Sequence, residues 1–195
     1  MTPTQTTITG GEGYRQMLEK AMTEYEIQTD FMRMVKEWSR YCSELALMYS
    51  TPNEGIRGRV TAAKRKAEGM RSGIPDVCLP VHVSMFGALY IEFKAEGGRL
   101  KPAQKIITKL LAITGNAVLV CWTPSGAWDL TQKYINGELD SRFSRSVAFV
   151  RPGGVVSFVP VTETINDLTR QLRELDEQPK PKGQFRRGGG RTFRK

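Results

Sequence analysis

Two acidic residues and a lysine stand at a spacing that could support hydrolytic chemistry. Asp76 lies in an apolar stretch, and Glu92-Phe93-Lys94 stands sixteen residues later. Side chains at positions i and i+2 of a strand share one face, so Glu92 and Lys94 should point one way and Phe93 the other. If the strand that begins at Asp76 pairs with a strand over residues 89–95, Asp76 comes close to Glu92. A metal-dependent phosphodiesterase needs such a set of two carboxylates and one lysine.

The carboxylates of Asp76 and Glu92 offer hard oxygen ligands, which suit Mg²⁺ or Mn²⁺, and the backbone carbonyl of Phe93 could be a further ligand. Lys94 could orient the attacking water, favour its deprotonated form, or stabilise charge on the phosphate, and the sequence does not choose among these roles. The alternative is an exposed charge cluster at a sheet edge. It is disfavoured because charges beside apolar strands are costly without a metal or a function.

Gln104 is a further candidate on a helix predicted over residues 102–114. It shares a stripe of that helix with Ile107 and Leu111. A polar amide aligned with an apolar face must find a partner or lose about 1–3 kcal/mol. The amide could cap the helix or fill a gap between helix and strand, or it could contact the attacking water, Lys94 or a phosphate.

The remaining pattern predicts an alternation of helices and strands. Ile27, Phe31, Met34, Trp38, Cys42 and Leu45 recur at spacings of three and four, which predicts one long first helix. Apolar periodicity and Gly or Pro boundaries predict further helices over 61–70, 102–114, 128–137 and 165–175. Short apolar runs predict strands over 45–50, 76–80, 89–95, 117–122, 147–150 and 155–159.

An ordered set of motifs over residues 24–138 resembles the VRR-NUC family of the PD-(D/E)XK superfamily. The matching segments are Tyr25-Glu26-Ile27-Gln28 with Trp38, Thr51-Pro52-Asn53-Glu54-Gly55, Lys66-Ala67-Glu68-Gly69-Met70, Gly73-Ile74-Pro75-Asp76, Ile91-Glu92-Phe93-Lys94 and Gln104-Lys105. The family usually has Gly where Glu54 stands. The resemblance implies an α/β fold with a PD-(D/E)XK restriction-endonuclease-like core, in which helices flank a mixed central sheet. It also implies a divalent metal and phosphodiester hydrolysis, and some members cut branched DNA.

The resemblance adds one residue to the candidate site. In the family pattern an acid on the first helix approaches the metal, and Glu26 matches that position as a catalytic and metal-binding candidate. The alternative is a solvated glutamate on a helix surface.

The chain divides into four predicted parts. Residues 1–12 are polar and expected to be disordered, and residues 13–140 form the nuclease-like domain. Residues 141–178 are expected to add a β-hairpin, with its turn at Arg151-Pro152-Gly153-Gly154, and a helix. This extension could cap the core, pair with a second subunit, or extend the binding surface. Residues 179–195 form a basic tail that is expected to be disordered.

The charge distribution points to nucleic acid as the partner, DNA first, with RNA not excluded. The net charge is +9, and residues 179–195 contain seven Lys or Arg and no acid, which leaves +2 for the rest. The segment QFRRGGGRTFRK is similar to RGG-type segments that bind nucleic acid. Candidate contacts there are Arg186, Arg187 and Arg191. A second group of basic residues could contact phosphates or could be solvated at the surface. These residues are Arg57, Arg59, Lys64, Arg65, Arg71, Arg99 and Lys105.

Other features limit the remaining possibilities. The longest apolar run, over residues 117–122, is too short to span a membrane, and no signal pattern opens the chain, so we expect a cytoplasmic protein, in the host cytoplasm if phage-encoded. Three widely spaced cysteines predict reduced thiols. Cleavage of DNA junctions would suit a homodimer, because two symmetric cuts need two sites. The competing hypothesis is a non-catalytic nucleic-acid-binding structural or assembly protein on a nuclease scaffold.

Overall fold

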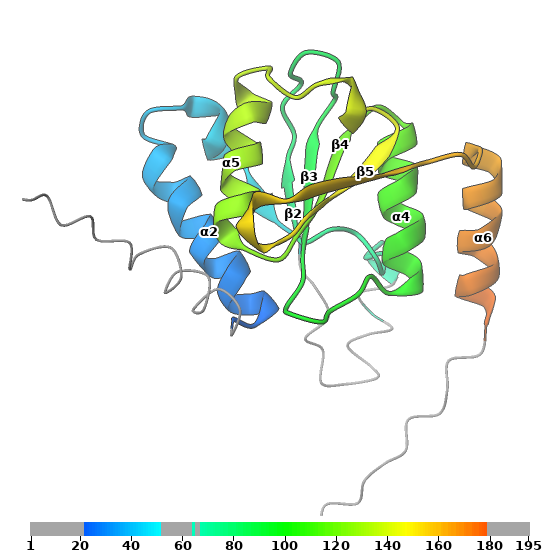
Figure 1. Cartoon of the computed structure of the whole chain (residues 1–195). Coiled ribbons are helices and arrows are strands. Elements are labelled where there is room, and N and C mark those ends of the chain that lie inside the picture. Colours follow the sequence, from blue (N-terminus) through cyan, green and yellow to red (C-terminus); the bar gives the residue numbers. More distant parts are fainter. Residues whose placement is uncertain (1–21, 52–63, 65–66, 179–195) are drawn as a thin grey trace, which may run out of the picture.

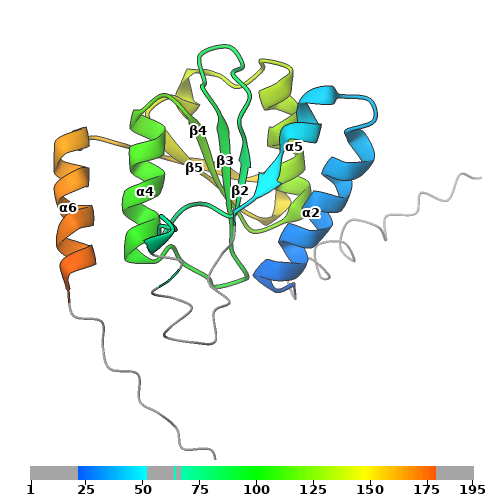
Figure 2. The same ribbon diagram turned by 180° about the vertical axis from the view of Figure 1, so that it is seen from behind.

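The computed structural model describes residues 22–51, 64 and 67–178, which form a six-stranded mixed sheet with helices on both faces (Figures 1 and 2). This architecture confirms the predicted α/β fold class. The strands are β1 (Tyr49–Ser50), β2 (Val77–Leu79), β3 (Leu89–Phe93), β4 (Ala117–Cys121), β5 (Ser146–Val150) and β6 (Val156–Pro160). The helices are α2 (Glu24–Trp38), α4 (Pro102–Ile113), α5 (Pro124–Ile135) and α6 (Ile165–Glu177), with short 3₁₀ turns η1 (Ser43–Leu47), η2 (Ser141–Phe143) and η3 (Pro152–Gly154).

The strands lie side by side in sequence order. β2 is antiparallel to both of its neighbours, β1 and β3. β3, β4 and β5 are parallel, and β6 returns antiparallel to β5. Parallel neighbours need long crossovers, and α4 and α5 supply them. α4 and α6 cover one face of the sheet, while α2 and α5 cover the other (Figures 1 and 2).

The core has two layers because β4 is buried on both faces. Leu119 and Cys121 belong to the apolar cluster on the α2 and α5 side, whereas Val118 and Val120 belong to the cluster on the α4 and α6 side. This alternation follows the two-residue period of a strand. A strand between two helical layers is expected to be apolar along its whole length, and every residue of β4 is buried.

The first helix and the first strand differ from the sequence prediction. α2 ends at Trp38, so Cys42 and Leu45 lie beyond it, and Leu45 is buried from η1 instead. The strand expected over 45–50 is only Tyr49–Ser50, because η1 occupies most of that segment. α5 begins earlier than expected, at Pro124, since the Thr123 hydroxyl caps the helix by accepting a hydrogen bond from the Gly126 N–H.

The predicted hairpin forms, and it lies within the main sheet. β5 pairs with β4 as well as with β6, so the segment after residue 140 extends the central sheet, and α6 then packs against α4. The segments 1–12 and 179–195, and half of the helix predicted over 61–70, lie outside the described residues. Among the described residues, no helix is long and apolar enough to span a membrane. The three cysteines are free thiols.

Candidate active site

The candidate site lies where β2 and β3 meet the start of α4, at the lower end of the sheet in Figure 1. β2 and β3 pair with Val77 opposite Ile91, so the same register places Asp76 opposite Glu92. The Asp76 Oδ2 atom accepts a hydrogen bond of 2.7 Å from the Phe93 backbone N–H. Antiparallel pairing therefore brings the two carboxylates, sixteen residues apart in the chain, to one end of the sheet.

Glu92 and Lys94 form a buried ion pair. Glu92 is fully buried and Lys94 is only 3% exposed. The Lys94 Nζ donates to Glu92 Oε1 at 2.5 Å and to the Phe93 carbonyl at 2.9 Å. Gln104 Nε2 donates to the same Glu92 oxygen. In contrast, Glu92 Oε2 is buried and has no hydrogen-bond partner among the described residues. Buried polar atoms normally have a partner, so this oxygen points to a missing group.

Burial and neighbouring charges shift the pKa values of Glu92 and Lys94. Burial and the Asp76 carboxylate raise the pKa of Glu92 to about 7, although the hydrogen bond and charge of Lys94 act in the opposite direction. Burial by itself lowers the pKa of Lys94, but its hydrogen bond to Glu92 and the charges of Glu92, Glu24 and Asp76 outweigh this effect and raise it. Lys94 therefore remains an ammonium group at neutral pH.

These side chains line a pocket of about 210 Å³. One wall is formed by a close approach between Gly73 and the start of α4. Gly73 has a φ of +90°, and a Cβ there would lie 2.7 Å from the carbonyl carbon of Ala103. A larger residue at position 73 would push the two segments apart. The pocket is lined by Glu24, Ser72, Gly73, Asp76, Glu92, Lys94, Arg99, Lys101, Ala103 and Gln104.

Gln104 has two contacts at the start of α4. Its Oε1 accepts a hydrogen bond of 2.9 Å from the Lys101 backbone N–H, and its Nε2 donates to Glu92. The first contact caps the helix. The second ties α4 to the carboxylate. The amide therefore caps the helix, and its contact in the site is to Glu92, which was not among the partners considered from the sequence.

The structure places Glu24 beside Lys94 and directs Glu26 elsewhere. Glu26 is exposed and accepts hydrogen bonds from the Thr23 backbone N–H and hydroxyl, which form a capping box. Glu24 lines the pocket, with its Oε1 3.4 Å from Lys94 Nζ. Helix positions two residues apart point about 200° away from each other, so only one of the two acids can face the site. Sequence reasoning missed Glu24, although the Thr23-to-Glu26 spacing already matched a capping box.

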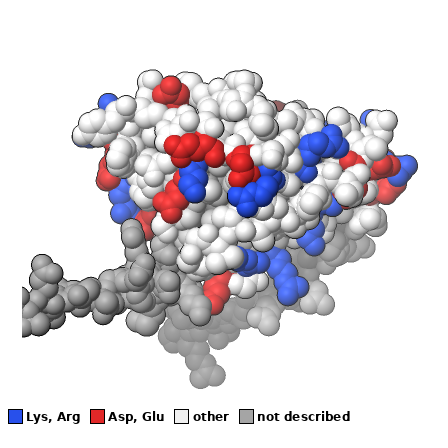
Figure 3. Space-filling view, turned by 45° about the horizontal axis from the view of Figure 1, so that its top comes forward, with Lys and Arg blue, Asp and Glu red and all other residues white. Residues whose placement is uncertain are grey.

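The predicted nucleic-acid contacts are only partly described. Arg99 lines the pocket. Arg71 and Lys105 are exposed, and each is next in sequence to a residue that lines the pocket. Lys64 lies 4.0 Å from the Glu68 carboxylate. Basic and acidic side chains alternate over the face seen in Figure 3, so that face has no uniform charge. The remaining candidates lie outside the described residues: Arg57, Arg59, Arg65, Arg186, Arg187 and Arg191.

The donor set fits a hard divalent cation. Asp76 and Glu92 supply carboxylates, and Glu92 Oε2 lacks a partner among the described residues. The carbonyl of Phe93, the residue after Glu92, accepts a hydrogen bond from the same lysine as Glu92 does. Within residues 22–51, 64 and 67–178 no group of three or more His, Cys, Asp or Glu is positioned to hold a metal. A cation here would therefore keep several waters, as Mg²⁺ commonly does.

Comparison with known proteins places the chain in a family. The family model of the VRR-NUC domain matches residues 13–123, more than half of the chain. One solved structure, a VRR_NUC domain protein, is 26% identical, with 60% of this chain and 90% of that chain covered and a TM-score of 0.49. A search of curated proteins gave no match. The chain belongs to the VRR-NUC domain family, whose members are of nuclease type.

Proposed function

We propose that this protein is a Mg²⁺- or Mn²⁺-dependent nuclease that hydrolyses phosphodiester bonds in DNA. The observation that carries the proposal is the buried, unpartnered Oε2 of Glu92 in a pocket that also contains Asp76 and Lys94. A buried carboxylate oxygen without a donor is costly, and a bound cation would offset that cost. Membership of the VRR-NUC family supports nucleic acid as the substrate.

Asp76, Glu92 and the Phe93 carbonyl would hold the cation. A divalent cation bound there supplies positive charge that lowers the pKa of a water molecule and neutralises the phosphate in the transition state. The Lys94 ammonium group adds a positive charge of the protein itself to that of the cation. Its Nζ already contacts Glu92 and the Phe93 carbonyl, so it faces the groups that would hold the cation and can donate to a phosphate oxygen beside them.

Glu24 and Gln104 act through these residues. Gln104 fixes the Oε1 of Glu92 by donating to it from α4. Glu24 attracts the Lys94 ammonium from α2. Both are positioning residues, and together they connect the start of each helix to the end of the sheet.

Selectivity for branched or junction DNA is part of the proposal. A four-way junction is resolved by two symmetric cuts, and a homodimer would provide two sites for them. Cleavage of four-way DNA and the molar mass of the protein in solution, with and without DNA, test this part together. A protein that stays monomeric under both conditions would contradict it.

The function is tested with purified full-length protein in Mg²⁺, Mn²⁺ or EDTA on linear, nicked, flapped and four-way DNA. We expect cleavage of at least one substrate with a metal and none in EDTA. Asp76→Ala and Lys94→Ala should each reduce the rate on the order of 10²–10³-fold. Asp129→Ala and Lys133→Ala are matched controls, because both residues are exposed on α5, and they should leave the rate unchanged.

Cutting that survives both site variants would place the activity elsewhere. Tight DNA binding without cleavage, for every metal and DNA geometry, would favour the non-catalytic binding or assembly protein. Thermal melts of all four variants show whether any loss of activity reflects unfolding.

A further inference from the structure

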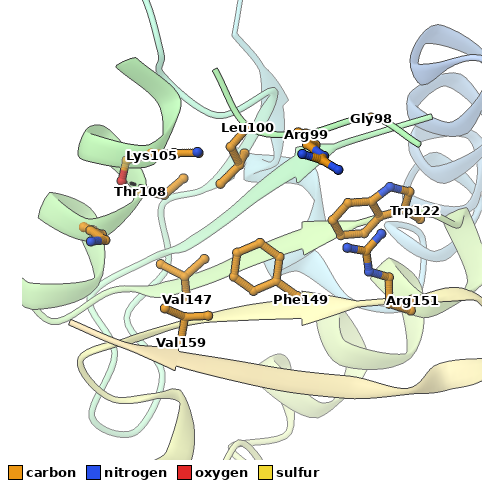
Figure 4. A pocket seen from close by; sticks show the side chains of 11 residues that line it. Gly98, Arg99, Leu100, Lys105, Thr108, Trp122, Val147, Phe149, Arg151 and Val159 are labelled. Atoms are coloured by element: carbon orange, nitrogen blue, oxygen red, sulfur yellow. Dashed lines mark hydrogen bonds between the residues drawn. The ribbon is translucent and has the colours of Figure 1, made fainter. Parts of the chain in front are cut away.

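A second pocket adjoins the candidate active site. It has a volume of about 390 Å³ and lies between α4, the loop over residues 98–100 and the strands β5 and β6, with Trp122 from the end of β4 (Figure 4). Arg99 lines both this pocket and the pocket of Asp76, Glu92 and Lys94. A ligand that fills one pocket therefore lies beside the other.

Flat side chains line one side of the second pocket. Phe149 lies on β5, and Arg151 is the first residue after this strand. The two are separated by one residue, so they share a face of the sheet. β5 pairs with β4 such that Cys121 lies opposite Val150, which brings Trp122 next to Arg151. The Arg151 guanidinium carbon lies 3.6 Å from the centre of the Trp122 ring, and the rings of Trp122 and Phe149 are 6.3 Å apart (Figure 4).

The pocket is positively charged. Arg99, Lys105, Lys109 and Arg151 line it, and no Asp or Glu does. Lys109 is paired with Glu163. Among the described residues, no carboxylate lies within ion-pairing distance of the other three cations, so their charge is available to an anionic ligand.

We propose that this pocket receives the base of an unpaired nucleotide in the DNA substrate, with a phosphate of that strand on Arg99. The inference rests on the proposed nuclease function, which makes DNA the polyanion. Phe149 and the stacked Arg151–Trp122 pair offer flat faces to a base, and such stacking is sequence-tolerant because every base has a π-face. Bases inside a duplex have both faces covered by their neighbours. The pocket therefore selects strands with an unpaired base next to the phosphate at the Asp76–Glu92–Lys94 site. Its volume lies within the usual range for small-molecule pockets.

The test compares two DNA probes bound to full-length protein in EDTA, so that no cleavage is needed. A labelled single-stranded oligonucleotide and a blunt duplex of the same length are titrated by fluorescence anisotropy. Phe149→Leu removes an aromatic face, and Arg151→Lys keeps the charge but loses the planar group. Each should weaken binding of the single strand about tenfold and leave duplex binding unchanged. Lys133→Arg, exposed on α5, should change neither.

A photo-crosslink gives an independent readout. A single strand that contains 5-iododeoxyuridine should crosslink to peptides with Trp122 or Phe149. Residues 179–195 are present in the wild type and in every variant, so any contribution they make to DNA binding is the same in each comparison of a variant with the wild type. Equal weakening on both probes, no weakening on either, or crosslinks confined to other segments would overturn the proposal. If Phe149→Leu melts at a lower temperature, the exposed Arg151→Lys decides the outcome.

The two proposals can fail separately. Asp76→Ala should lose cleavage and keep the preference for the single strand. A wild-type protein that never cuts but shows the preference contradicts only the nuclease function. A protein that cuts while Phe149→Leu and Arg151→Lys bind both probes like the wild type contradicts only the base pocket.

Discussion

Gln104 and Lys94 donate hydrogen bonds to the same oxygen of Glu92, one from α4 and the other from the end of β3. The carboxylate is thus held on one oxygen by two side chains, and its other oxygen remains available. This arrangement fixes the direction in which Glu92 can bind a further group.

Gln104 tests whether that fixation matters. Gln104→Ala should lower the cleavage rate roughly 10- to 100-fold, the usual cost of losing a partner of a metal ligand. It should also lower the free energy of unfolding by about 1 kcal/mol, because the Lys101 N–H loses its acceptor. Gln104→Glu keeps that acceptor but donates nothing to Glu92 and places a second carboxylate beside it, so it should also lose activity. A fully active Gln104→Glu variant would remove Gln104 from the site.

Glu24 and Glu26 form a matched pair. Glu24→Gln removes the charge beside Lys94 and should lower the cleavage rate about tenfold. Its effect on stability should be small because the Glu24 side chain is half exposed. Glu26→Ala breaks the capping box and should lower the free energy of unfolding without changing the rate. Chemical denaturation and initial cleavage rates measure both effects. The opposite result would return Glu26 to the site.

The pKa of Glu92 predicts how stability depends on pH without metal. The pKa is 4.5 for the ordinary group and about 7 in the fold, so between these values the folded protein binds more protons than the unfolded one. The contribution of Glu92 to stability is then full below about pH 4.5 and falls as the pH rises toward 7. The melting temperature of the wild type in EDTA should therefore carry a loss between pH 5 and pH 8 that Glu92→Gln, which is always neutral, does not show.

The melting temperature of Glu92→Gln minus that of the wild type should therefore be lower at pH 5, where Glu92 is protonated in the fold, than at pH 8. Asp129→Asn, an exposed acid on α5, should show no such dependence. An equal difference at both pH values would show that the buried carboxylate does not titrate in this range.

Divalent metal should raise the melting temperature. A cation that binds only the folded state stabilises it by RT ln(1 + [L]/Kd), which is about 2.7 kcal/mol at a hundredfold excess over Kd. Titration of Mn²⁺ in a thermal-shift assay should therefore shift the wild-type transition upward. Asp76→Asn should abolish the shift, and Asp129→Asn should retain it. A shift of equal size in Asp76→Asn would mean that the metal binds elsewhere.

The sequence determined the local parts of the site. The two-residue period of a strand put Glu92 and Lys94 on the same side, and an antiparallel neighbour that begins at Asp76 brought the second carboxylate near. The position of Gln104 in the first turn of α4 was also predicted from its helix. These features depend on neighbours within a few residues, or on one pairing between adjacent strands, and short-range patterns encode both.

The tertiary structure alone decided which first-helix acid faces Lys94 and how the second pocket forms. Glu24 and Glu26 are both plausible on an isolated helix, and the rotation of α2 against the sheet makes the choice. The sequence predicted the hairpin turn near Pro152, but no short-range sequence pattern shows that β5 pairs with β4. That pairing sets Trp122 beside Arg151, since contacts between distant segments depend on how the whole core packs.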